Sequence, residues 1–71
     1  MMLNPRIGQL VQLWYGPRWR PHCPYHGAIG VVVCVGRGPG PWNHGVRIGG
    51  RFVVVPCGNL RKVPPMLERK P

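Results

Sequence analysis

Apolar residues in this chain gather in short runs between glycines and prolines, without the spacing of a helix. Residues 8–14 alternate imperfectly between apolar and polar side chains, and residues 27–35 are apolar at nearly every position. Alternation is typical of a strand with one buried face, and a short continuous apolar run is typical of a central strand. These two stretches are predicted to be the first and second strands.

The clearest local pattern lies in residues 46–55, where two runs rich in β-branched residues flank a Gly-Gly pair at 49–50. Such a pair is the signature of a two-residue hairpin turn, which requires positive φ angles. The register that follows places Ile48 opposite Arg51. We therefore predict a β-hairpin over this segment.

The remaining pattern completes an all-β chain. Residues 56–59 are predicted to form a tight turn, and residues 60–63 a last short strand before a Pro-Pro pair. Residues 15–26 and 36–45 are predicted to be long loops, since both are rich in proline or glycine. No stretch combines a helical period with a cap, and the chain contains no Ser, Thr or Asp to serve as one.

Three segments resemble parts of SH3-like small barrels of the KOW type. Residues 8–13 are similar to their opening strand, and residues 27–33 match their Gly-x-x-Gly-x-Val core. Residues 55–63 resemble the passage from a fourth strand through Pro and a single helical turn into a fifth strand. The resemblance covers residues 7–63 and implies a five-stranded SH3-like small barrel with long first and second loops and extended termini.

The resemblance also divides the chain into parts. Residues 1–6 form an N-terminal arm with no evident anchor, residues 7–63 the SH3-like barrel, and residues 64–71 a basic C-terminal tail. The opening Gly-x-Leu-Val-x-Leu and the closing Pro…Leu-x-x-Val also resemble the corresponding segments of short barrel proteins encoded by tailed phages. That likeness implies a virion component, such as a capsid cement, decoration or connector-type protein.

Charge changes the picture more than any motif. Ten Lys and Arg residues stand against one acid, Glu68, for a formal net charge of +9. With one carboxylate, and with no acid to orient a Cys–His pair, the chain offers no set of groups for acid–base or nucleophilic catalysis. We therefore predict that it is not an enzyme, and that it binds an acidic or polyanionic partner.

Recognition of basic Pro-rich peptides is not expected. Peptide-binding SH3 domains carry acidic residues in the first loop, whereas this loop carries Arg18 and Arg20. Interfaces are enriched in Trp, Tyr and Arg, and bases stack on aromatic side chains within basic grooves. The predicted partner-binding residues are the aromatic and basic residues of the two loops and the hairpin: Arg18, Trp19, Arg20, Tyr25, Arg37, Trp42, Arg47 and Arg51.

Each of these residue types also has a plainer interpretation. Trp14 and Trp42 can cap the ends of a small barrel, and Arg47 and Arg51 can protect an edge hairpin from pairing with other chains. Arg61 can be solvated. The excess of cations argues against these as a complete explanation, since ordinary surfaces mix both signs.

Zinc is an alternative that the sequence leaves open. Cys23 and His26 are three positions apart, and Cys57 with Cys34 or His44 would complete a set of Cys and His ligands. No second closely spaced Cys/His pair exists, so we predict no cofactor. The odd number of cysteines and the absence of a signal peptide favour an intracellular, reducing compartment, with a virion as the later setting.

Two functions follow from these observations. The first is a structural interaction module that binds acidic protein surfaces of a larger assembly, in many copies, with neither a membrane nor a small-molecule substrate. The second is a KOW-like domain that binds RNA or single-stranded DNA.

Overall fold

The computed structural model describes residues 2–36 and 42–64, which form five strands and two short 3₁₀ turns. No α-helix occurs in these two ranges, and none of their helical turns is long and apolar enough to cross a membrane. In chain order the elements are β1 (Leu10–Leu13), η1 (Arg20–His22), β2 (Ile29–Val35), β3 (Asn43–Ile48), β4 (Arg51–Pro56), η2 (Cys57–Asn59) and β5 (Leu60–Lys62).

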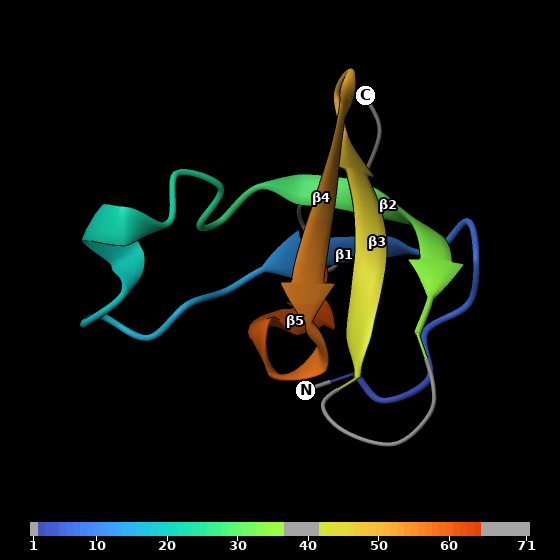
Figure 1. The fold of residues 1–71 in the computed structure, drawn as a ribbon, viewed down its shortest axis with the longest axis horizontal. Helices are drawn as coiled ribbons and strands as arrows, with labels where there is room; N and C mark the ends of the chain where they lie inside the picture. The colour runs from blue at the N-terminus through green and yellow to red at the C-terminus, as the bar shows by residue number, and fades with distance from the viewer. Residues whose placement is uncertain (1, 37–41, 65–71) are drawn as a thin grey trace.

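The strands form one antiparallel sheet in the order β4-β3-β2-β1-β5 (Figure 1). The predicted all-β class with five strands is thus confirmed, and the strand order is consistent with an SH3-like fold. Within the described residues β4 and β5 remain the two edges of the sheet, so the closed barrel is not confirmed. The β3–β4 hairpin passes in front of β1 and β2 in Figure 1, which shows how strongly the sheet bends.

A small apolar core lies on the concave side of this bend. Branched aliphatic side chains from all five strands pack into it, as expected for alternating strands that bury one face. Gly30 of β2 also faces inward, and a Cβ there would come within 2.6 Å of the Arg47 carbonyl oxygen. The buried cluster consists of Val11, Leu13, Val32, Val46, Val55 and Leu60.

The predicted hairpin register is confirmed. Ile48 pairs with Arg51 at the turn, and Val46 pairs with Val53 further along the hairpin. Gly49 has a φ of +60°, which is the left-handed conformation that favours glycine in such a turn. Local turn chemistry was therefore sufficient to set this register.

The second loop was predicted to extend to Gly45, and this boundary is wrong. β3 begins at Asn43, because His44 pairs with Val55 and is completely buried. The His44 ring accepts a hydrogen bond at Nδ1 from the Gly36 N–H (3.2 Å), and its Nε2 lies 3.1 Å from the Met2 carbonyl oxygen. A neutral ring with its proton on Nε2 satisfies both contacts, which makes burial of this histidine possible.

The N-terminal arm was expected to have no anchor, yet the structure fastens it to the sheet. The Met2 N–H donates to the Cys57 carbonyl oxygen at 3.0 Å, in addition to the contact of Met2 with His44. Met2 also packs against the core, and Pro5 is buried. The arm therefore covers one side of the core that the five strands leave open.

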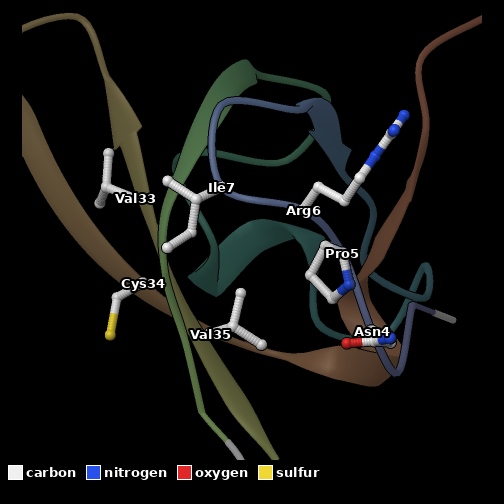
Figure 2. A pocket seen from close by; sticks show the side chains of 7 residues that line it. All are labelled: Asn4, Pro5, Arg6, Ile7, Val33, Cys34 and Val35. Carbon is white, nitrogen blue, oxygen red and sulfur yellow. The ribbon is translucent and has the colours of Figure 1, made fainter.

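A shallow hollow lies between this arm and the end of β2 (Figure 2). In Figure 2 the Arg6 side chain points away from Val33 and Cys34, and Ile7 projects toward β2. Most of the lining is aliphatic, and Cys34 is the one titratable group besides Arg6 among the seven residues that line it. The hollow thus brings together no set of catalytic groups.

Candidate functional site

The loop between β1 and β2 is ordered by its own backbone. Its ends are joined where the Leu13 N–H donates to the Ala28 carbonyl oxygen (2.9 Å) and the Gly27 N–H donates to the Leu13 carbonyl oxygen (2.7 Å). Successive turns within the loop, including η1, add further hydrogen bonds from residues 19–28. The loop therefore projects from the sheet as a defined structure (Figure 1).

Five side chains meet where this loop leaves β1, and we call them the Trp14 cluster. The guanidinium carbon of Arg61, from β5, lies 3.5 Å from the centroid of the Trp14 ring, and that of Arg20 lies 5.2 Å from it. The His26 ring lies 4.5 Å from Trp14 between centroids and 6.3 Å from Tyr15. Two cations on one indole are attracted by its negative face, an interaction worth about 0.5–2 kcal/mol each.

Each arginine of the Trp14 cluster is held by a hydrogen bond from its own Nε atom. The Arg61 Nε donates to Oε1 of Gln12 at 2.8 Å, and the Arg20 Nε donates to the Tyr15 carbonyl oxygen at 2.9 Å. Gln12 is itself held by a bond from its Nε2 to the Gly27 carbonyl oxygen at 3.0 Å. Within residues 2–36 and 42–64, no hydrogen bond occupies the terminal amino groups of either guanidinium group, which can therefore bind another molecule.

Two hydrogen bonds join the backbone of Trp14 to Asn59 in η2. The Trp14 N–H donates to the Asn59 carbonyl oxygen at 2.8 Å, and the Asn59 side-chain amide donates to the Trp14 carbonyl oxygen at 3.3 Å. Trp14 is 37% exposed, so the residue remains partly accessible to solvent. The Trp14 cluster is thus an ordered surface feature, formed by four residues of the first loop and one residue of β5.

No carboxylate side chain lies among residues 2–36 and 42–64, because Glu68 is the one acid of the chain. The two arginines of the Trp14 cluster therefore have no anionic side chain within the described structure. Guanidinium groups bind carboxylates and phosphates through paired hydrogen bonds, which are stronger than those between neutral groups. Chemically, the Trp14 cluster is suited to bind an anion.

Comparison with known proteins adds no family to this description. No protein-family model, curated protein or solved structure matches the chain. Its function must therefore be argued from the site.

The environment of the Trp14 cluster favours the uncharged form of its two titratable rings. Burial, and to a smaller extent the neighbouring Cys23, raises the pKa of Tyr15 above its ordinary value of 10.0. Desolvation lowers the pKa of His26 below its ordinary value of 6.5, and the positive charges of Arg20 and Arg61 lower it further. The neutral His26 ring accepts a hydrogen bond at Nδ1 from the Tyr15 N–H at 3.0 Å.

This arrangement predicts a loss of stability in acid that depends on His26. Because its pKa is lower in the folded state, the unfolded chain binds more protons, and stability falls as the pH drops from 6.5 through the lowered pKa. Melting temperatures at about pH 7.5 and pH 5 should differ more for the wild type than for His26→Gln, since glutamine does not titrate. An equal acid-induced loss in both proteins would contradict this role of His26.

The structure brings only some of the predicted partner-binding residues together. Arg20 belongs to the Trp14 cluster, whereas Arg18 and Trp19 are exposed beside it in the first loop, with 59% of Trp19 accessible. Tyr25 instead packs, half-buried, against the core. Trp42 is half-buried too, and its carbonyl oxygen accepts the Cys57 N–H at 2.8 Å.

The remaining predicted positions lie elsewhere. Arg47 and Arg51 are exposed on the β3–β4 hairpin. The turn of this hairpin lies away from the first loop in Figure 1. Arg37 lies outside the described residues. The exposed members of the set among the described residues are thus divided between two surfaces, the first loop and the hairpin.

The predicted partner-binding residues include neither Trp14 nor Arg61. Their proximity follows from the pairing of β1 with β5, in which Gln12 lies opposite Arg61 and Leu13 opposite Leu60. That pairing is the signal that would have revealed the contact, since it places the start of β5 beside the end of β1.

The cysteines and histidines do not assemble a metal site in the described residues. The three cysteines are free thiols, and no group of three or more His, Cys, Asp or Glu residues is close enough to hold a metal ion within residues 2–36 and 42–64. His26, one of the zinc candidates, has its Nδ1 occupied by the Tyr15 N–H. The zinc alternative, which needed Cys23, His26 and Cys57 together, thus gains no support.

Proposed function

We propose that this chain is a non-enzymatic interaction module that binds acidic protein surfaces through the Trp14 cluster. The observation that carries the proposal is the pair of arginines ordered on one tryptophan without a neighbouring carboxylate. Their positions are fixed before a partner arrives, so binding costs less side-chain entropy than it would for mobile arginines. Trp and Arg residues are also enriched among the hot spots of protein interfaces.

The wider charge distribution supports an assembly as the partner. Exposed cations occur on the N-terminal arm (Arg6), the first loop (Arg18), the hairpin (Arg47) and β5 (Lys62). Cations on several sides of so small a domain suit a protein with several neighbours, where acidic subunits supply the missing countercharge. The resemblance to short tailed-phage proteins suggests a phage particle as the setting, with this chain in many copies.

Nucleic-acid binding is the second candidate, and one observation favours it. Trp19 is 59% exposed, and its neighbours in the chain are the exposed Arg18 and Arg20. A base can stack on such a ring while the arginines bind phosphates, as in proteins that bind single strands. RNA or single-stranded DNA would then occupy the first loop.

A titration distinguishes the two candidates. Tryptophan fluorescence is recorded while poly-L-glutamate or an oligothymidylate is added at several sodium chloride concentrations. We expect poly-L-glutamate to bind, because it offers carboxylates to Arg20 and Arg61. Tighter binding of oligothymidylate, with an affinity that falls steeply with salt, would favour the nucleic-acid candidate instead. Binding of neither polymer at low salt would contradict both.

A further inference from the structure

A second surface, independent of the Trp14 cluster, lies along the edge strand β4. In the described residues β4 pairs only with β3. Ile48 and Arg51 flank the two-residue turn and so form a hydrogen-bonded pair, and such pairs alternate along an antiparallel ladder. Phe52 and Val54 therefore point their backbone N–H and C=O groups away from β3. No backbone hydrogen bond from another described segment reaches these two residues.

The side chains of the same two residues are apolar and exposed. Phe52 is 62% accessible and Val54 is 61% accessible. Both lie on the outer face of the sheet, because Phe52 pairs with the exposed Arg47, and Val54 pairs with Gly45. The Phe52 ring lies over Gly45, which has no side chain to displace it. A Cβ at Gly45 would lie 2.6 Å from carbons of that ring.

This edge has little of the usual protection against pairing with another strand. Edge strands are commonly blocked by proline, lysine or a bulge within the strand. In β4 the one proline is Pro56 at its end, and the one charge is Arg51 at its start. From Phe52 to Val55 the edge is regular and apolar, so it can accept an additional strand.

We propose that β4 is a docking edge for an extended acidic–apolar segment of a partner protein, which adds to the sheet as a sixth strand. Backbone groups of Phe52 and Val54 form the ladder, and alternate apolar side chains of the segment pack beside theirs on the outer face. Acidic residues of the segment lie near the turn, where Arg47 and Arg51 supply positive charge. A second copy of this chain is disfavoured as the occupant, because it carries a charge of +9 and the same arginines.

Selection from a displayed random-peptide library tests this docking edge with no partner chosen beforehand. The immobilised wild-type protein is the target, and binders are then compared on Val54→Pro and Val54→Thr. Proline removes the outward N–H of residue 54, whereas threonine keeps that N–H and the branched shape. We expect selected peptides to alternate apolar residues and to carry Asp or Glu. Their affinity should fall about tenfold or more on Val54→Pro and change little on Val54→Thr.

Amide hydrogen exchange of the wild-type protein with a selected peptide locates the contact. The proposal requires slower exchange at Phe52 and Val54 in the complex. It is overturned if no peptide is selected, if the selected peptides are basic or Pro-rich, or if Val54→Pro binds them normally. It is also overturned if the two amides become protected by self-association without peptide. Peptides that bind the Trp14 cluster instead would lose affinity on Arg20→Gln/Arg61→Gln and keep it on Val54→Pro, so the docking edge and the proposed function can fail separately.

Discussion

Replacing His44 by alanine is expected to remove a large part of the stability of this domain. The ring is completely buried in β3 and joins the Gly36 N–H to the Met2 carbonyl oxygen. Truncation leaves a cavity and two backbone groups without their partner, which together should cost about 3 kcal/mol or more. A 71-residue domain has a total stability of roughly 4–10 kcal/mol. Urea denaturation followed by tryptophan fluorescence measures the loss.

Two further variants separate the causes of this loss. His44→Phe keeps an aromatic ring and fills the cavity but loses both hydrogen bonds, so we expect a smaller loss of about 1–3 kcal/mol. His22→Ala, in an exposed position of η1, should change stability by about 0.5 kcal/mol or less. If His44→Ala were as stable as His22→Ala, the role of His44 in fastening the N-terminal arm would be wrong.

Neutralising both arginines of the Trp14 cluster is expected to have the largest effect on binding. Arg20→Gln with Arg61→Gln should weaken binding of poly-L-glutamate by roughly 10- to 100-fold, because each guanidinium loses its charge-assisted hydrogen bonds to carboxylates. The matched control is Arg6→Gln with Lys62→Gln, which removes the same charge from exposed positions outside the cluster. This control should retain most of the affinity, since it lowers only the general attraction.

Single-residue variants show whether weaker binding comes from the lost contact with the partner or from a change in folding. Arg61 donates a hydrogen bond to the side-chain amide of Gln12, which is 5% exposed. Replacing Arg61 therefore also removes this partner from a buried amide. Arg20 is exposed, and Arg20→Gln should lower the melting temperature by only a few degrees, through the loss of its contact with Trp14, while still weakening binding. Equal affinities for Arg20→Gln and the wild type would remove Arg20 from the binding site.

The parts of the fold that could be predicted are those governed by neighbouring residues. The Gly-Gly pair at 49–50 determines the hairpin register, because the turn itself requires positive φ. The start of β3 could not be predicted in this way, since the loop before it is rich in proline and glycine. His44 joins the strand because Gly36 and Met2, distant in sequence, supply its hydrogen bonds.

The candidate site was even less accessible from the sequence. Arg20 and Trp19 were predicted from their local pattern of aromatic and basic residues. Trp14 and Arg61 are 47 positions apart, and only the antiparallel pairing of β1 with β5 brings them together. Local composition indicates that a basic aromatic surface exists, whereas the strand order determines which residues form it.

The proposal that the Trp14 cluster binds acidic proteins is tested most directly by what the protein retains from its native source after nuclease treatment. Tagged wild-type protein, the Arg20→Gln/Arg61→Gln variant and the Arg6→Gln/Lys62→Gln control are purified in parallel, and the retained proteins are quantified by mass spectrometry. We predict that wild type and control retain the same acidic proteins in stoichiometric amounts, and that the cluster variant loses them. Loss of every partner on nuclease treatment, or equal retention by all three proteins, would contradict the proposal.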